Sequence, residues 1–312
     1  MKNLLTHIYL ALKGFYILKP VVFVCILFSF SSFLSAIEVI NIRPITYSGD
    51  QKESYKYQLI DLLLSHTEEK YGAYQIRFNL PVNSQKREIS LLNEGKINVF
   101  ISMTSRSREE DMLAIRYPVY KGLYGYRVFI IKSSEQKKFS SIRNLEQLKT
   151  LLAVQGSHWP DYEILKSNGL NVTGSSSSNS QFQMLQHGHV DYFPRGIHEP
   201  WKELNDRPNT GLAIEKNLML YYPAPGYIFV AKNNIQLARR LREGFKKIIE
   251  SGEFDHFFNK HPQIVEMKRQ ADLENRLLFK LSNPLLSPYT PLKDKRLWFN
   301  IDNESGFSHT NY

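Results

Sequence analysis

Two similar segments decide the fold: GYRVFIIK at residues 125–132 and GYIFVAK at residues 226–232. Each is predicted to be a strand that opens with Gly-Tyr and closes with Lys. Residues 133–224, which separate them, alternate strand and helix patterns of their own. The sequence therefore predicts an inner unit inserted into an outer one, with the two segments as the crossings between them.

The outer unit shows the same alternation on both sides of the insertion. Apolar residues at every second position predict strands, and apolar residues three and four apart predict helices. The predicted strands lie at residues 37–47, 74–80 and 97–103, and the predicted helices at 55–72 and 87–94. An amphipathic helix followed by a shorter one is predicted within 236–261. We therefore expect an α/β fold with two lobes, each a mostly parallel sheet flanked by helices, and a ligand cleft between them.

These patterns divide the chain into expected domains, with lobe 1 at residues 37–125 and 226–262 and lobe 2 at residues 126–225. A C-terminal helix and an extended strap are expected at 263–300, with the helix ending at Asn283-Pro284. The strap is expected to pack on a lobe; the alternative is that it docks a partner. Residues 301–312 are expected to be disordered.

Residues 1–36 are predicted to be a signal peptide. They contain no acidic residue, carry three lysines ahead of an apolar run at 21–36, and end in the small residues Ser35 and Ala36. That run is shorter than the roughly 20 apolar residues that span a bilayer as a helix. An uncleaved anchor is the alternative, and in either case we expect the rest of the chain to be exported to the periplasm. Ile37 stands where a lipoprotein would need cysteine.

Composition and charge exclude several classes of protein. The only cysteine, Cys25, lies in the predicted signal peptide, so the mature chain has no disulfide framework, thiolate metal site or cysteine nucleophile. The 312 residues carry a net charge of +10, which becomes +7 once the three lysines of the signal peptide are removed. An exported protein does not routinely meet nucleic acid, so this charge indicates a general attraction to anionic solutes or surfaces.

Three longer phrases resemble the periplasmic solute-binding proteins of family 3, which have the type II binding fold and serve amino-acid transporters. The phrases are LLNEGKINVFISMTSRSREEDMLAIRYPVYKGLYGY at 91–126, LKTLLAVQGS at 148–157 and LQHGHVDYFPRG at 185–196. The resemblance covers residues 37–262. It implies a monomer that captures a small carboxylated solute, an amino acid or a related organic acid, and presents it to a membrane transporter without a cofactor.

The resemblance also implies a set of ligand-binding residues. Arg108 begins a helix shortly after Met103-Thr104, and its planar guanidinium would match a carboxylate. The alternative is an exposed arginine balanced by the acids that follow it. The remaining candidates from this part of the resemblance are Thr104, Tyr120, Ser157 and Trp159.

One position departs from the family pattern. Relatives that hold an α-amino acid place an acid about eight residues after the glycine of the third phrase, to pair with the ligand's ammonium. Here that position is Gly196, beside Arg195, and Glu199 is the nearest substitute, so Arg195 and Glu199 complete the candidate ligand-binding residues. Arg195 would repel an ammonium, so an amino acid and a different organic acid remain alternatives.

Other groups of residues give weaker evidence for a metal site or a catalytic site. His187, His189 and Asp191 would share one face of a strand, but the glycine between them favours a turn, and no metal site is predicted. The chain contains no GxSxG, HExxH or phosphate-binding glycine motif. An exported enzyme of the same fold, such as a dehydratase, and a sensory ligand-binding module are the alternative functions.

Overall fold

The structure, a computed structural model, describes residues 37–44, 50–78 and 84–299. The predicted signal peptide, the predicted tail and parts of the predicted strands at 37–47 and 74–80 lie outside these residues. Val39 and the described residues after it belong to one compact unit, whereas Ile37 and Glu38 belong to another. None of the helices in the described ranges combines the length and apolar character that crossing a membrane requires.

The first lobe is built on a sheet whose central strand comes from late in the sequence. Its strands are β1 (Glu38–Ile42), β2 (Tyr74–Phe78), β3 (Phe100–Met103), β4 (Leu113–Ile115) and β11 (Gly226–Val230). β11 runs antiparallel between β3 and β4, and a parallel bridge from Ile42 to Val99 links the β1–β2 pair to β3.

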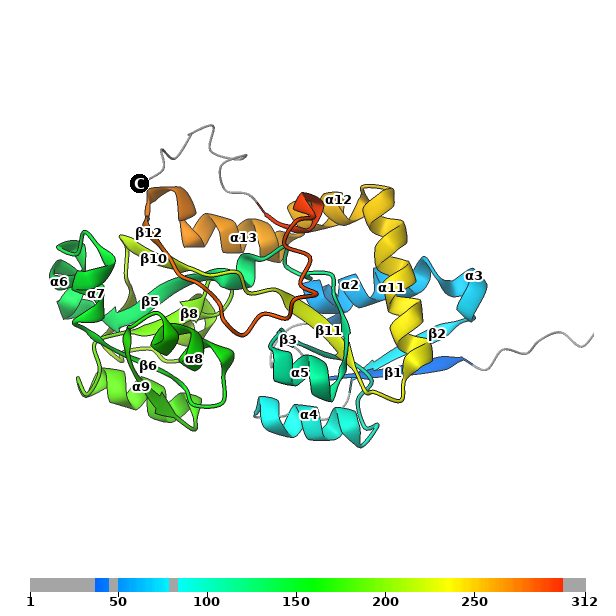
Figure 1. Cartoon of the computed structure of the whole chain (residues 1–312), viewed down its shortest axis with the longest axis horizontal. Helices are drawn as coiled ribbons and strands as arrows, with labels where there is room; N and C mark the ends of the chain where they lie inside the picture. Colours follow the sequence, from blue (N-terminus) through cyan, green and yellow to red (C-terminus); the bar gives the residue numbers. More distant parts are fainter. Residues whose placement is uncertain (1–36, 45–49, 79–83, 300–312) are drawn as a thin grey trace, which may run out of the picture. The chain divides into compact units, whose positions relative to one another are not determined.

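Helices cover this sheet, and side chains cap several of them. The helices are α2 (Tyr55–Ser65), α3 (Glu68–Tyr71), α4 (Gln85–Asn93), α5 (Arg106–Asp111), α11 (Ile235–Glu250) and α12 (Glu253–Lys260). Ser54, Ser84 and Ser105 each accept a hydrogen bond from a backbone N–H in the first turn, which satisfies a group that a helix start leaves free. α11 packs across α2 (Figure 1), and together their apolar faces form much of the lobe's core.

The second lobe has its own sheet, centred on β5 (Tyr126–Lys132). The other strands are β6 (Leu152–Gly156), β7 (Asn171–Ser175), β8 (Phe193–Gly196), β9 (Leu212–Ile214), β10 (Leu218–Tyr221) and β12 (Leu277–Lys280). β5 runs antiparallel to β8, β9 and β10, whereas β6 is parallel to β7 and is joined by a parallel bridge to the residue before β8.

Short helices connect these strands. They are α6 (Gln136–Ser140), α7 (Leu145–Lys149), α8 (Pro160–Ser167), α9 (Ser178–Gln186) and α10 (Pro200–Asn205). Single 3₁₀ turns lie at η1 (Gln51–Glu53), η2 (Leu123–Gly125), η3 (Ser133–Glu135), η4 (Leu273–Asn275) and η5 (Lys295–Leu297). A second apolar cluster, separate from that of the first lobe, fills the interior beneath β5, β6 and β10.

The predicted α/β class and the two lobes are confirmed. β5 and β11 are the two predicted crossings, and each runs antiparallel to its neighbours because it enters its sheet from the side of the other lobe. The carboxyl ends of β1, β3, β6 and β8 therefore face the same region as the amino ends of β5 and β11. In an α/β fold this edge of the sheet is where a ligand site is expected.

The paired glycines that open the crossings have a steric reason. A Cβ on Gly125 would lie 2.2 Å from the backbone oxygen of Tyr222, and one on Gly226 would lie 2.3 Å from the ring of Tyr124. The two chain segments between the lobes therefore approach each other so closely that a side chain at either position would overlap the opposite segment.

Replacing Gly125 by alanine is expected to lower the free energy of unfolding by about 1–2 kcal/mol, since the clash is with a backbone atom that cannot swing aside. Urea denaturation measures this, with Lys232→Ala, an exposed change at the end of the second crossing segment, as the control. Equal midpoints for the two variants would contradict the steric argument.

The C-terminal segment differs from the prediction of one long helix. α13 (Pro262–Ala271) ends at Asp272, whose φ of +47° breaks the helix, and the following residues form β12, parallel to β10. Local apolar spacing could not distinguish a continued helix from a strand, because the run Leu277–Lys280 pairs with a strand that lies about sixty residues earlier in the chain.

The segment that follows β12, where the strap is predicted, contacts both lobes. Asn168, at the end of α8 in the second lobe, donates to the carbonyl of Ser282 at 2.8 Å. The N–H of Arg106, in α5 of the first lobe, donates to the carbonyl of Leu285 at 3.1 Å. In Figure 1 this orange-to-red segment runs from β12 toward β11.

Candidate functional site

A cavity of about 280 Å³ opens where the carboxyl ends of the first lobe's strands meet the second lobe. Both lobes contribute charged and polar side chains to its walls. Those of the first lobe are Arg43, Lys56, Gln85, Glu88, Ser102 and Arg108, and those of the second lobe are Arg127, Asp161, Arg195, His198 and Glu199.

Arg108 lies in the wall of this cavity, as the sequence predicts. Ser105 caps α5 and fixes the backbone N–H of Arg108, so that the side chain turns back toward the end of β3. Its Nη1 donates to Ser102 Oγ at 2.7 Å and to the carbonyl of Met103 at 2.6 Å, and its Nη2 donates to Gln85 Oε1 at 2.7 Å. All three acceptors are neutral, so the charge of Arg108 is not matched by these bonds. Burial lowers the pKa of Arg108 to about 10, which leaves it charged at neutral pH.

Lys56, in the first turn of α2, also lines the cavity. It makes no hydrogen bond or ion pair with any residue in the described part of the chain. Its neighbour Arg43 is paired with Glu88 at 2.8 Å. Burial lowers the pKa of the Lys56 ammonium, and the carboxylates of Glu88 and Glu199 only partly oppose this.

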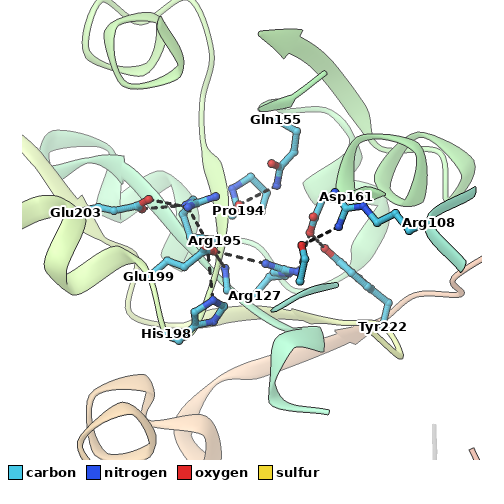
Figure 2. A network of polar contacts seen from close by, with 12 residues as sticks. Arg108, Arg127, Gln155, Asp161, Pro194, Arg195, His198, Glu199, Glu203 and Tyr222 are labelled. Atoms are coloured by element: carbon cyan, nitrogen blue, oxygen red, sulfur yellow. Dashed lines mark hydrogen bonds and ion pairs between the residues drawn. The ribbon is translucent and has the colours of Figure 1, made fainter. Parts of the chain in front are cut away.

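Across the cavity, Arg127 and Asp161 form a buried ion pair. Arg127 Nη2 lies 2.8 Å from Asp161 Oδ1, and Tyr222 donates its hydroxyl to the same carboxylate. Arg127 Nη1 lies 3.7 Å from Glu199, while its Nε has no partner among the described residues. Figure 2 shows this pair between the side chains of Arg108 and Glu199.

Arg195 belongs to a second buried network (Figure 2). It donates to both oxygens of Glu203, at 2.6 and 2.9 Å, and to Glu199 at 2.7 Å. Its guanidinium carbon also lies 4.8 Å from the ring centroids of Trp159 and Phe193. Burial, the largest single effect, would raise the pKa of Glu199, but the surrounding cations, Arg195 first among them, and the N–H of Gly196 together outweigh it, and the pKa falls to about 2.

His198 lines the cavity as a neutral ring. It stacks on Tyr124, with ring centroids 4.4 Å apart, and on Tyr120 at 5.7 Å. Burial, together with the nearby cations Lys56 and Arg127, lowers its pKa to about 3 against the opposing effect of Glu199. At neutral pH this ring therefore adds no positive charge to the site.

The structure brings four of the predicted site residues to the cavity, namely Arg108, Trp159, Arg195 and Glu199. The other three predicted residues are not among those that line it. Thr104 is fully buried and donates to Glu109, and Ser157 is exposed at the β6–β7 edge, where its N–H bonds to the carbonyl of Ser175. Tyr120 is buried against Tyr55.

Lys56, Arg127, Asp161 and His198 line the cavity and were missed by the sequence analysis. A partial signal existed for two of them. Arg127 is the one charged residue in the interior of the apolar segment 125–132. Asp161 lies two residues after Trp159, the last residue of the predicted ligand loop. Lys56 sits in an ordinary amphipathic helix, where a lysine is normally solvated.

Metal ligands do not converge within residues 37–44, 50–78 and 84–299, where no group of three or more His, Cys, Asp or Glu side chains could hold an ion. Gly188 has a φ of +75°, so His187 and His189 flank a turn, as predicted, and both are exposed. Asp191 accepts from the N–H of Leu152 at 2.7 Å and pairs with Lys138, which is a structural role.

Comparison with known proteins identifies the fold of this chain but not its family. No protein-family model and no curated protein matches the chain. Solved structures do match: an ancestral arginine-binding protein bound to arginine is 19% identical with a TM-score of 0.50, over 72% of this chain and 97% of that one. The probable amino-acid ABC transporter extracellular-binding protein ytmK of Bacillus subtilis is 16% identical with a TM-score of 0.51, over 73% and 98%.

A third structure agrees with these two. The periplasmic His/Glu/Gln/Arg/opine family-binding protein of Silicibacter pomeroyi, solved in complex with lysine, is 10% identical with a TM-score of 0.50, over 72% of this chain and 96% of that one. At such low identity the likeness concerns the fold. The chain has the type II periplasmic-binding-protein fold, as the resemblance in its sequence predicted.

Proposed function

We propose that the chain is an exported solute-binding protein of family 3 that captures a small carboxylated solute between its two lobes. In this proposal it works as a monomer in the periplasm and presents the solute to a membrane transporter. The solved proteins of the same fold are binding proteins for small molecules, which supports this role. The single observation that carries it is the position of Arg108, buried in the wall of a two-lobed cavity with only neutral acceptors.

The energetics of Arg108 favour an anionic ligand. Its side chain is largely removed from water, with 9% of its surface exposed. A buried charge without a counter-ion is unfavourable, because neutral hydrogen bonds replace only part of its hydration. A ligand carboxylate would supply that counter-ion through two parallel hydrogen bonds, and closing the lobes around it would exclude water from the pair.

Ligand-induced stabilisation tests the proposal. The purified protein is screened by thermal unfolding against amino acids and organic acids, and at least one carboxylated compound is expected to raise Tm by about 5 °C at a concentration well above its Kd. Arg108→Gln is expected to abolish that shift, because it removes the charge that the ligand neutralises.

Arg106→Gln is the matched control, since Arg106 lies in the same helical turn but is exposed. It is expected to keep the shift of the unchanged protein. A shift that survives Arg108→Gln, or that is lost equally in both variants, would contradict the assignment of Arg108. No shift with any acid would overturn the proposed function itself.

A further inference from the structure

The acids of the cavity are already engaged by cations of the protein. Glu88 accepts from Arg43 at 2.8 Å, and Asp161 is paired with Arg127 at the same distance. Glu199 forms an ion pair with Arg195, from which it accepts a hydrogen bond at 2.7 Å, and it also accepts from the N–H of Gly196 at 2.8 Å. A ligand ammonium would have to compete with these partners. At Asp161 it would leave Arg127, with 4% of its surface exposed, without its nearest carboxylate, which is strongly unfavourable.

The cationic side chains of the cavity outnumber its acidic side chains. Five cationic and three acidic side chains line the cavity. Ion pairs account for Arg43, Arg127 and Arg195, the last of which also pairs with Glu203, so among the described residues Arg108 and Lys56 have no carboxylate partner. Arg108 is bonded to neutral groups only, and Lys56 has no partner within the part of the chain that the structure describes.

We infer that the natural solute is a dianionic acid without a free amino group, such as a short dicarboxylate. One carboxylate pairs with Arg108 and the other with Lys56. This inference rests on the proposed function and narrows it, because the solved proteins of the same fold are described as binding arginine or lysine, which carry amino groups.

The dimensions of the cavity agree with a short ligand. Its volume of about 280 Å³ is at or below the lower end of the roughly 300–1,000 Å³ typical of small-molecule pockets. Arg108 comes from α5, after β3, and Lys56 from α2, after β1, so the two cations reach the cavity from different elements. A two-ended ligand can therefore use both, whereas a monocarboxylate can neutralise only one.

Matched pairs of acids test this inference. Binding of succinate, glutarate and adipate is measured by titration calorimetry beside aspartate, glutamate, butyrate and arginine. At least one dicarboxylate is expected to bind about ten- to a hundredfold more tightly than both its amino derivative and the monocarboxylate, which is the range that a hydrogen-bonded charge contributes.

Variants of Lys56 then locate the second carboxylate. Lys56→Gln is expected to weaken dicarboxylate binding at least about tenfold and butyrate binding much less, whereas Lys56→Arg keeps the charge and retains most of the dicarboxylate affinity. Lys246→Gln, an exposed lysine on α11, is the control for the loss of one charge. Thermal unfolding without ligand verifies that each variant is folded.

The outcomes separate this inference from the proposed function. Glutamate, aspartate or arginine binding as tightly as the dicarboxylates would overturn the dianion inference while leaving a solute-binding protein. Equal loss of butyrate and dicarboxylate affinity in Lys56→Gln would also overturn it. If no acid in the panel binds, both the dianion inference and the proposed function are overturned.

Discussion

Replacing Asp161 by alanine is expected to lower the free energy of unfolding by about 3–5 kcal/mol, because it removes one partner of a buried ion pair. Arg127 has 4% of its surface exposed and lies 2.8 Å from Asp161. Without that carboxylate its nearest acid is Glu199, 3.7 Å away and already paired with Arg195. The hydroxyl of Tyr222 would lose its acceptor as well. Urea denaturation measures the change.

A double variant distinguishes the charge effect from a simple loss of packing. In Arg127→Met/Asp161→Ala both charges are absent, so we expect it to be more stable than Asp161→Ala alone, since no unpaired cation remains buried. Glu163→Ala, an exposed change in the same helical turn, serves as the control and should stay within about 0.5 kcal/mol of the unchanged protein. A double variant less stable than Asp161→Ala would contradict this account.

The fold was largely predictable because its pattern is local. Alternating strand and helix periodicities, and the repeated Gly-Tyr opening of β5 and β11, are all visible within short windows of sequence. The direction of those two strands within their sheets was not visible, because it depends on pairings such as that of β5 with β8. The same limit explains the error at β12, where a distant strand outweighed the local helical spacing.

The site was only partly predictable because charges are paired across elements. Arg108 could be found because it follows a strand and begins a helix. Arg195 was predicted to contact the ligand, and it does line the cavity, but Glu203 and Glu199 neutralise it. These acids lie eight and four residues further along the chain, a spacing that could have suggested the pairing. The cavity position of Lys56 depends on how α2 packs, which no short window records.

Lowering the pH from 7.5 to 5 is expected to reduce the free energy of unfolding through His198, by less than about 2 kcal/mol because 25% of its side chain is exposed and water screens its charge. Burial lowers its pKa to about 3 in the folded protein, below the ordinary value of 6.5 that applies once the chain unfolds. The unfolded state therefore takes up a proton as the pH falls through 6.5, while the folded state does so only near 3. The stabilisation is complete above 6.5 and is lost progressively below it.

The difference between two histidine variants isolates this effect. His198→Asn cannot titrate, so its stability should fall less between pH 7.5 and pH 5, by up to about 2 kcal/mol, than that of His189→Asn, which changes a histidine that does not line the cavity. Burial lowers the pKa of His261 too, but His261 is present in both variants and its contribution cancels. The window also stays above the ordinary pKa of 4.5 for Glu199, so the loss of that carboxylate's charge contributes little. Parallel urea midpoints for the two variants across this range would mean that the His198 ring is hydrated and protonates in the folded protein.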